Sequence, residues 1–216
     1  SNEMKIQKPF KVSTHLKDII GRDLVTNEFV AIFELVKNSV DAGANLIQIE
    51  IDPKANLMRI VDDGKGMGID DIIEKWLFVA YSAKADGSED LDYRDKIKLT
   101  RGYAGSKGIG RFSCDTLGKK LRLYSKNNDK QQKAISLSVD WLKFEYDSKE
   151  EFKDISVELN EDDKFPTLKM ATTPIGVGTI LQIEELRHGW DDENVRRLRS
   201  YLAKLIDPFG TTKSVK

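Results

Sequence analysis

The order of apolar patterns along the chain predicts an α/β (α+β) fold in two layers, with one mixed β-sheet covered on one face by helices. Helix-like periodicity appears first, strand-like alternation dominates the middle, and another helix-like pattern closes the sequence. The sequence has 216 residues and no internal repeat, and a chain of this length can bury a core. We therefore predict a single domain over residues 1–216, with residues 1–24 as an N-terminal segment.

The composition is typical of a soluble globular protein, with 39% hydrophobic and 33% charged residues. The net charge of -1 gives no electrostatic reason to expect nucleic acid or an anionic membrane as a partner. Cys114 is the only cysteine, which excludes an intrachain disulfide and a zinc site built of cysteines. No apolar run approaches the roughly 18 residues of a membrane span. We expect a cytoplasmic protein without a membrane partner.

The first predicted element is a helix over residues 27–42, followed by a strand over residues 45–52. Phe29, Ile32, Phe33, Val36 and Val40 recur with a period of 3.6 and define one apolar face. Glycine after the last periodic residue, at position 43, is typical of a helix end. The segment "NLIQIEID" then alternates between apolar and polar residues, as a half-buried strand does.

The rest of the chain alternates strands with loops and contains three more helices. A short apolar strand leads into a glycine-rich loop that ends at Gly68, and a helix is expected over residues 69–80. The charged stretch from Tyr81 to Arg101 has the length of a lid or binding loop. "GYAGSKGIGRFSCDTLG" passes from a glycine-rich loop into a helix. Later strands are predicted over 120–126, 132–140, 153–159 and 176–186, and a last helix over 191–207.

A row of polar residues interrupts the first predicted helix. Glu34, Asn38 and Asp41 lie at i, i+4 and i+7, opposite the apolar face. A solvent-exposed stripe is the simpler interpretation, but such stripes usually carry lysine, and asparagine is a poor helix former. The amide oxygen of Asn38 is a suitable ligand for Mg²⁺, and Glu34 could orient a water molecule as a general base. The helix alone leaves both interpretations open.

The segment "IVDDGKGMG" places two carboxylates and three glycines after an apolar strand. Asp-Gly is a common turn dipeptide, so a tight turn is the simpler interpretation. Alternating glycines at 64, 66 and 68 exceed the needs of a turn and would let a flat ligand approach the backbone. Asp62, at the strand end, could accept a hydrogen bond from an exocyclic amine.

A second glycine-rich segment, "GYAGSKGIGRF", precedes a predicted helix. Its backbone N–H groups, with Lys107 and Arg111, would favour a phosphate group. The spacing is neither that of a Walker A loop nor that of a dinucleotide-binding fingerprint. On its own, the segment is equally well explained as a flexible loop.

The motifs occur in the order E-x-x-x-N, D-x-G-x-G, a charged stretch ending in G-x-x-G-x-G, and a Gly178-Thr179 pair that enters a strand. Together they resemble the GHKL ATPase superfamily, which includes DNA gyrase, the ninety-kilodalton heat-shock chaperone, histidine kinases and MutL. The resemblance extends from Val25 to Ile183. It implies the two-layer Bergerat fold, with residues 80–111 as an ATP lid.

The resemblance also implies a role for each matching residue. Glu34 corresponds to the general base that activates water, and Asn38 to the Mg²⁺ ligand. Asp62 corresponds to the carboxylate that receives the adenine amino group, and Thr179 to the threonine that supports this contact. Further nucleotide contacts are implied for Asp41, Ala42, Gly64, Gly66, Met67, Lys84, Gly105, Ser106, Lys107, Gly108, Ile109, Gly110, Arg111 and Phe112.

These implications predict an enzyme that binds ATP with Mg²⁺ and hydrolyses it slowly, driving a conformational change or dimerisation. The segment "SKGIGRFSCDTLGKKLRLYSK" is similar to bacterial chaperone-like members of the superfamily, so a client protein and a second copy of the chain are expected partners. A MutL/MORC-like DNA-processing module, a histidine-kinase ATP-binding domain and a non-hydrolysing nucleotide switch remain alternatives. No segment matches the domain that supplies a phosphate-sensing Lys or Arg, so we expect further domains after residue 216, through which nucleic acid could also be bound.

Overall fold

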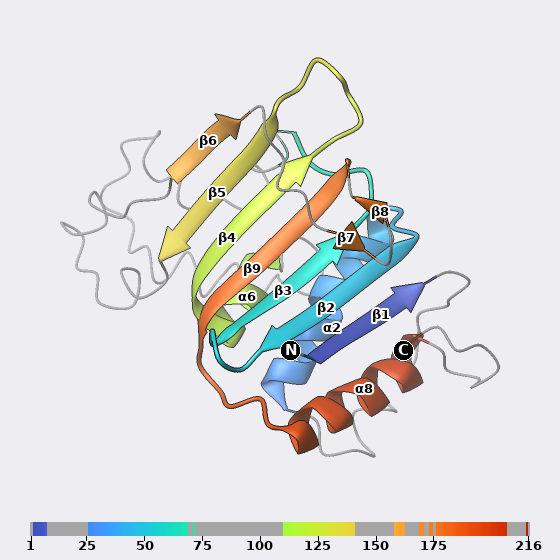
Figure 1. Ribbon diagram of the computed structural model, residues 1–216, viewed down its shortest axis with the longest axis vertical. Helices are drawn as coiled ribbons and strands as arrows, with labels where there is room; N and C mark the ends of the chain where they lie inside the picture. Colours follow the sequence, from blue (N-terminus) through green and yellow to red (C-terminus); the bar gives the residue numbers. More distant parts are fainter. Residues whose placement is uncertain are drawn as a thin grey trace, which may run out of the picture.

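The computed structural model describes residues 2–7, 26–68, 71, 110–140, 158–162, 169–170, 173–174, 176–206 and 215. These residues form three helices and nine strands (Figure 1). The helices are α2 (Asn27–Asp41), α6 (Gly110–Leu117) and α8 (Asp192–Ile206). The strands are β1 (Asn2–Gln7), β2 (Leu46–Asp52), β3 (Leu57–Asp62), β4 (Gly118–Lys126), β5 (Ala134–Asp140), β6 (Glu158–Asp162), β7 (Lys169–Met170), β8 (Thr173–Pro174) and β9 (Gly178–Leu186).

The main sheet has seven strands in the order β1-β2-β3-β9-β4-β5-β6. Every pair of neighbours in it is antiparallel, so the prediction of a mixed sheet is wrong in this detail. The reason is the position of β9. Strands β3 and β4 run in the same direction, but β9 returns from late in the chain and lies between them, antiparallel to both.

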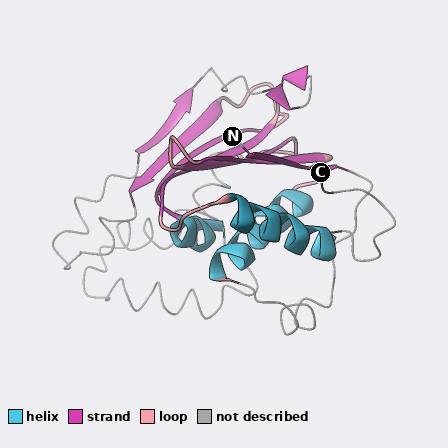
Figure 2. Ribbon diagram, turned by 60° about the horizontal axis from the view of Figure 1, so that its bottom comes forward, coloured by secondary structure: helices cyan, strands magenta, loops and turns pink. Residues whose placement is uncertain are grey.

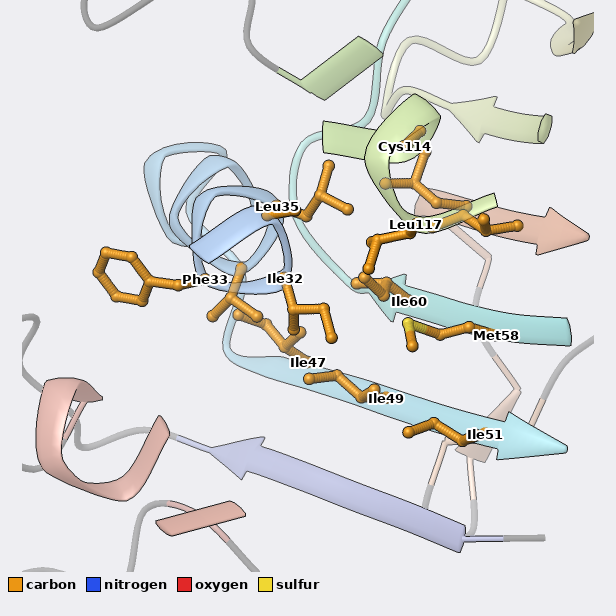
Figure 3. Packing of buried hydrophobic residues seen from close by; sticks show 14 of the residues in the cluster. Ile32, Phe33, Leu35, Ile47, Ile49, Ile51, Met58, Ile60, Cys114 and Leu117 are labelled. Carbon is orange, nitrogen blue, oxygen red and sulfur yellow. The ribbon is translucent and has the colours of Figure 1, made fainter. Parts of the chain in front are cut away.

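The helices cover one face of this sheet, as Figure 2 shows. The predicted two-layer α/β architecture, with helices on one face, is therefore confirmed. The buried core lies between the layers and is built largely from aliphatic side chains. Figure 3 shows Ile47, Ile49 and Ile51 of β2 in this layer, together with Met58 and Ile60 of β3.

Helix α2 is the central helix of the covering layer, and it begins and ends as the sequence predicts. The Thr26 side chain accepts a hydrogen bond from the Phe29 backbone N–H (3.3 Å) and caps the N-terminus. At the other end, Gly43 adopts a positive φ of 76°, which glycine accommodates without strain.

More of the α2 surface is buried than its apolar periodicity predicts. Ala31, Leu35 and Ser39 are buried, although they lie outside the predicted apolar face. Helix α6 packs against α2, and Ser39 contacts Asp62 of β3. Figure 3 shows the Leu35 side chain pointing from α2 toward Cys114 and Leu117 of α6.

Strand β1 was not predicted, because no element was assigned within the N-terminal segment of residues 1–24. It pairs with β2 at the edge of the sheet. The available signal was the alternation in "NEMKIQ", where Met4 and Ile6 are buried. Arg199 of α8 donates a hydrogen bond from Nη2 to the Glu3 carbonyl oxygen (3.3 Å), which joins this edge to the helix layer.

Most of the predicted later elements agree with the structure to within two residues at each end. The strands at 120–126, 132–140 and 176–186 and the helices after Gly110 and over 191–207 are confirmed by β4, β5, β9, α6 and α8. Strand β6 lies further along the chain than the predicted strand at 153–159, and the short β7–β8 pair lies within a predicted loop. The predicted helix at 69–80 and the lid at 80–111 fall outside the described residues, except for Asp71 and the first two residues of α6.

Candidate functional site: a buried carboxylate at the end of the sheet

The carboxylate of Asp62 is a charged group buried on the helix-covered face of the sheet. Asp62 is the last residue of β3, and only 6% of it is exposed. The Ser39 hydroxyl of α2 donates a hydrogen bond to Oδ2 (2.7 Å), and the Gly64 backbone N–H donates one to Oδ1 (2.9 Å). The sheet end, the first helix and the glycine-rich loop therefore meet at this carboxylate.

Burial raises the pKa of the Asp62 carboxyl from its ordinary value of 3.8 to about 6. The bonds from Ser39 and Gly64 oppose this rise in pKa, and the neighbouring charge of Asp63 adds to it. At neutral pH the group is ionised, and each carboxylate oxygen can accept more than one hydrogen bond. Asp62 can therefore receive a further N–H donor.

Ser39 is a site residue that the sequence reasoning missed. Its side chain is 4% exposed and lies on the flank of α2 that faces the sheet end. The available signal was a serine next to Asn38 in an otherwise apolar part of the helix.

The glycine-rich loop is held closely against its neighbours by the protein backbone. The Lys65 backbone N–H donates a hydrogen bond to the Ala42 carbonyl oxygen at the end of α2 (2.9 Å). Gly66 has a φ of 69°, and a Cβ at this position would overlap the Lys126 carbonyl oxygen. The second carboxylate, Asp63, has a structural role, because its Oδ1 accepts hydrogen bonds from the backbone N–H groups of Asn45 (2.7 Å) and Leu46 (2.9 Å).

These contacts change the interpretation of the glycines. The sequence suggested that their missing side chains leave room for a flat ligand. At Gly64 and Gly66, that space is occupied by Ala42 and by the end of β4. These two glycines therefore allow close packing of the loop within the protein.

Thr179 lies beside Asp62 in the sheet, as the second residue of β9. The two residues are register partners in the β3–β9 pair. Gly178 has a φ of 143°, and a Cβ there would overlap the Asp62 carbonyl oxygen. The Gly178-Thr179 pair thus brings β9 close to the carboxylate, as its position in the sequence suggested.

Ser125 of β4 is a second residue that sequence reasoning missed. It is fully buried and is the register partner of Thr179 on the side away from β3. Its Oγ lies 2.9 Å from Thr179 Oγ1 and accepts a hydrogen bond from the Met67 backbone N–H (2.8 Å). Its signal in the sequence was a serine at an inward-facing position of a strand, two residues after Leu123.

The polar row of α2 lies on the helix side that the core leaves open. Asn38 and Asp41 are exposed and Glu34 is half-buried, while Ala42 is half-buried beside the glycine-rich loop. Burial and the charge of Glu34 raise the pKa of Tyr201 of α8 to about 12. Asn38 and Asp41 lie within one turn of Ser39, and Glu34 lies five residues before it. The row therefore continues from the Asp62 site along the helix.

The phosphate-binding motif is described only in part. Gly110 begins α6, and Arg111 and Phe112 lie in its first turn, but the side chains of these two residues are not among those described. Helix α6 packs against α2, so this end of the motif lies beside the first helix. The remaining predicted site residues, Lys84, Gly105, Ser106, Lys107, Gly108 and Ile109, lie outside the described residues.

The donors available for a metal ion are few. In the described ranges, no group of three or more His, Cys, Asp or Glu side chains could hold a metal. Asn38 offers one exposed amide oxygen, which fits Mg²⁺ bound mainly through water and phosphate oxygens.

Comparison with known families gives one match. The model of the family described as "Histidine kinase-, DNA gyrase B-, and HSP90-like ATPase" matches residues 25–169, about two thirds of the chain. The match includes the helix with Glu34 and Asn38 and the strand that ends at Asp62, and it ends before Thr179. A search of curated proteins found no match. Within the described part of the chain, no helix is long and apolar enough to cross a membrane.

Proposed function

The chain belongs to the family of histidine kinase-, DNA gyrase B- and HSP90-like ATPases, and from this premise we propose that it binds ATP with Mg²⁺ and hydrolyses it slowly. The observation that carries the proposal is the buried Asp62 carboxylate, held in place by Ser39 and Gly64 and flanked by Thr179. A buried ionised carboxylate lowers the stability of the folded protein. Recognition of a ligand would explain why this protein has one at Asp62.

We propose that Asp62 binds the adenine base, because its hydrogen-bonding groups complement those of adenine. An ionised carboxylate only accepts hydrogen bonds, and the 6-amino group of adenine only donates them. Guanine presents a carbonyl oxygen at the same place, which would face the carboxylate without a proton between them. The Thr179 hydroxyl would support the same edge of the base, while Gly64, Gly66 and Met67 would border the base and ribose.

The phosphates are assigned to the polar row of α2 and to the motif that ends in α6. Five residues separate Ser39 from Glu34, or about 7.5 Å along the helix axis, so the row extends away from the base site. Mg²⁺ would neutralise phosphate charge, with Asn38 as its protein ligand. Glu34 would accept a proton from the attacking water, and Asp41, Ala42, Lys84 and residues 105–112 would complete the contacts.

Within the family we propose a chaperone-like module in which ATP drives a conformational change or dimerisation and acts on a client protein. The support is the similarity of residues 106–126 to chaperone-like members and the presence of Glu34, which a non-hydrolysing switch does not need. We propose slow turnover because no phosphate-sensing Lys or Arg was identified in the sequence.

Calorimetric titration of ATP with Mg²⁺ tests the base site. The wild type is expected to bind, and Asp62→Asn is expected to lose most of its affinity, because the amide turns an N–H donor toward the adenine amine. Asp52→Asn is the matched control. Asp52 also accepts two backbone hydrogen bonds (both 3.1 Å), but it is the last residue of β2 and pairs with the opposite end of β3 from Asp62. No binding by the folded wild type, or equal binding by Asp62→Asn, would overturn the proposal.

Hydrolysis is tested separately with Glu34→Gln. The variant is expected to bind ATP as the wild type does and to release phosphate at least about a hundredfold more slowly, the usual range for loss of a general base. Release of phosphate at the wild-type rate would show that Glu34 is not the base. Loss of binding together with hydrolysis would place Glu34 in nucleotide binding.

A further inference from the structure

Three polar side chains form one row across neighbouring strands at the end of the sheet. Asp62 of β3 pairs with Thr179 of β9, and Thr179 pairs with Ser125 of β4. All three residues are buried. The row is bounded by isoleucine on both sides, because Asp62 also pairs with Ile47 and Ser125 with Ile135. Asp62 reaches Ser39 of α2, so the row faces the helix layer.

Ser125 has more hydrogen-bond partners than a buried serine needs for its own satisfaction. Its hydroxyl accepts a hydrogen bond from the Met67 backbone N–H (2.8 Å) and lies within reach of the Gly178 carbonyl oxygen (3.2 Å) and of Thr179 Oγ1 (2.9 Å). A serine hydroxyl has one proton and two lone pairs. All three are used when Ser125 donates to the Gly178 oxygen and accepts from Met67 and Thr179. Ser125 thus connects β4, β9 and the glycine-rich loop.

The direction of the Ser125 proton decides what Thr179 presents to a ligand. When Ser125 donates to Gly178, the Thr179 proton is directed to Ser125 and Thr179 presents lone pairs. When Ser125 donates to Thr179, the Thr179 proton is free for a ligand acceptor. Both arrangements use the same heavy-atom positions, and in both of them Ser125 holds the Met67 amide.

We propose that Ser125 is a positioning residue for the base end of the nucleotide site: it orients the Thr179 hydroxyl and fixes the loop at Met67. This inference rests on the proposed function, because it assigns Ser125 to the base that Asp62 and Thr179 would recognise. Ser125 acts through Thr179 and Met67 and has no contact of its own with the reacting phosphates.

The position of Ser125 predicts a specific pattern of effects. ATP and ADP share the base, so loss of the Ser125 hydroxyl should weaken the binding of both nucleotides by the same factor. It should raise KM and leave kcat unchanged, because Glu34 and Asn38 lie on α2 and not on β3, β9 or β4, which carry Asp62, Thr179 and Ser125. A merely structural role would lower stability without this pattern.

The test is calorimetric titration of ATP and ADP, each with Mg²⁺, into the wild type, Ser125→Ala and Ser136→Ala. Ser136 is the matched control, because it is half-buried on the neighbouring strand β5, opposite Tyr124. We expect Ser125→Ala to raise Kd about tenfold for both nucleotides, equivalent to about 1.4 kcal/mol, and Ser136→Ala to leave both values unchanged. Thermal unfolding establishes that each variant is folded at the titration temperature.

The outcomes separate this inference from the proposed function. Wild type that binds neither nucleotide refutes the proposed function and this inference together. Wild type that binds both, with Ser125→Ala binding equally well or losing affinity for ATP alone, refutes only the role of Ser125. Should Ser125→Ala fail to fold, Ser125→Cys replaces it, because a buried cysteine packs as a small apolar residue and is a poor hydrogen-bond acceptor; the same tenfold loss is expected.

Discussion

Replacing Asp62 by asparagine should make the protein more stable while removing its affinity for nucleotide. The substitution keeps the size of the side chain and removes the charge. The amide oxygen can still accept from the Gly64 N–H, and the amide N–H₂ can donate to Ser39, whose hydroxyl turns to accept. The hydrogen bonds to Ser39 and Gly64 are therefore preserved, and the cost of a buried carboxylate is removed.

The magnitude follows from the pKa of Asp62, which rises from 3.8 to about 6 on folding. That difference corresponds to about 3 kcal/mol. Because the folded pKa is the higher one, protonation of Asp62 favours the folded state. This contribution is complete below pH 3.8 and is lost as the pH rises to about 6. At pH 7.5 the ionised Asp62 therefore costs about 3 kcal/mol, and Asp62→Asn should recover most of it.

Urea denaturation at pH 7.5 and at pH 4 measures the effect. The free energy of unfolding of Asp62→Asn should exceed that of the wild type by about 3 kcal/mol at pH 7.5 and by less than about 1 kcal/mol at pH 4. Using the difference between the two proteins cancels the other groups that titrate in this range. Asp52→Asn, at the end of β2, should show no such gain.

Two results would refute this reasoning. A wild type as stable as Asp62→Asn at pH 7.5 would mean that the carboxylate is not destabilising in the folded protein. A stability gain of the same size at both pH values would mean that packing, and not charge, distinguishes the variant.

Three further perturbations test other parts of the structure. Ser39→Ala removes a hydrogen bond to the ionised Asp62 and should lower the free energy of unfolding by about 2 kcal/mol at pH 7.5, with a smaller loss at pH 4; equal losses in urea denaturation at both pH values would contradict the role of Ser39. Gly178→Ala places a Cβ against the Asp62 carbonyl oxygen at a φ of 143° and should cost about 2–4 kcal/mol. Gly189→Ala is its control, because a Cβ there meets nothing within 4 Å, and thermal unfolding should show only the first variant to be impaired. Tyr201→Phe removes a buried hydroxyl that has no hydrogen-bond partner among the described residues, so stability should rise by about 1 kcal/mol. Since the pKa of Tyr201 is raised to about 12, the wild type should also lose stability relative to this variant between pH 10 and pH 12; parallel pH profiles would contradict this.

Much of the fold was determined by local sequence patterns. Helix α2 was predicted because its apolar residues recur every 3.6 positions and Gly43 follows them. The Thr26 cap at its N-terminus was recognised only in the structure. Strand β2 was predicted because apolar and polar residues alternate along it. Strands β4, β5 and β9 were also predicted, and β4 and β5 show the same alternation. Strand β1 was missed because six residues at a chain end give too short an alternation, and its stability comes from pairing with β2. The family resemblance, and not a local pattern, implied that Asp62 and Thr179 are neighbours, and the two residues pair in the β3–β9 register.

Only the tertiary structure decided how these elements meet. The sequence does not reveal that β9 lies between β3 and β4, because strand pairing over more than a hundred residues depends on which faces can be buried together. That insertion aligns Asp62, Thr179 and Ser125 in one buried row, and the packing of α2 on the sheet brings Ser39 against Asp62. Asp62 and the glycine-rich loop could be recognised in the sequence because their motif is local. The buried environment that raises the pKa of Asp62, and the hydrogen bonds from Ser39 and Ser125 that organise the site, arise only when distant segments pack together.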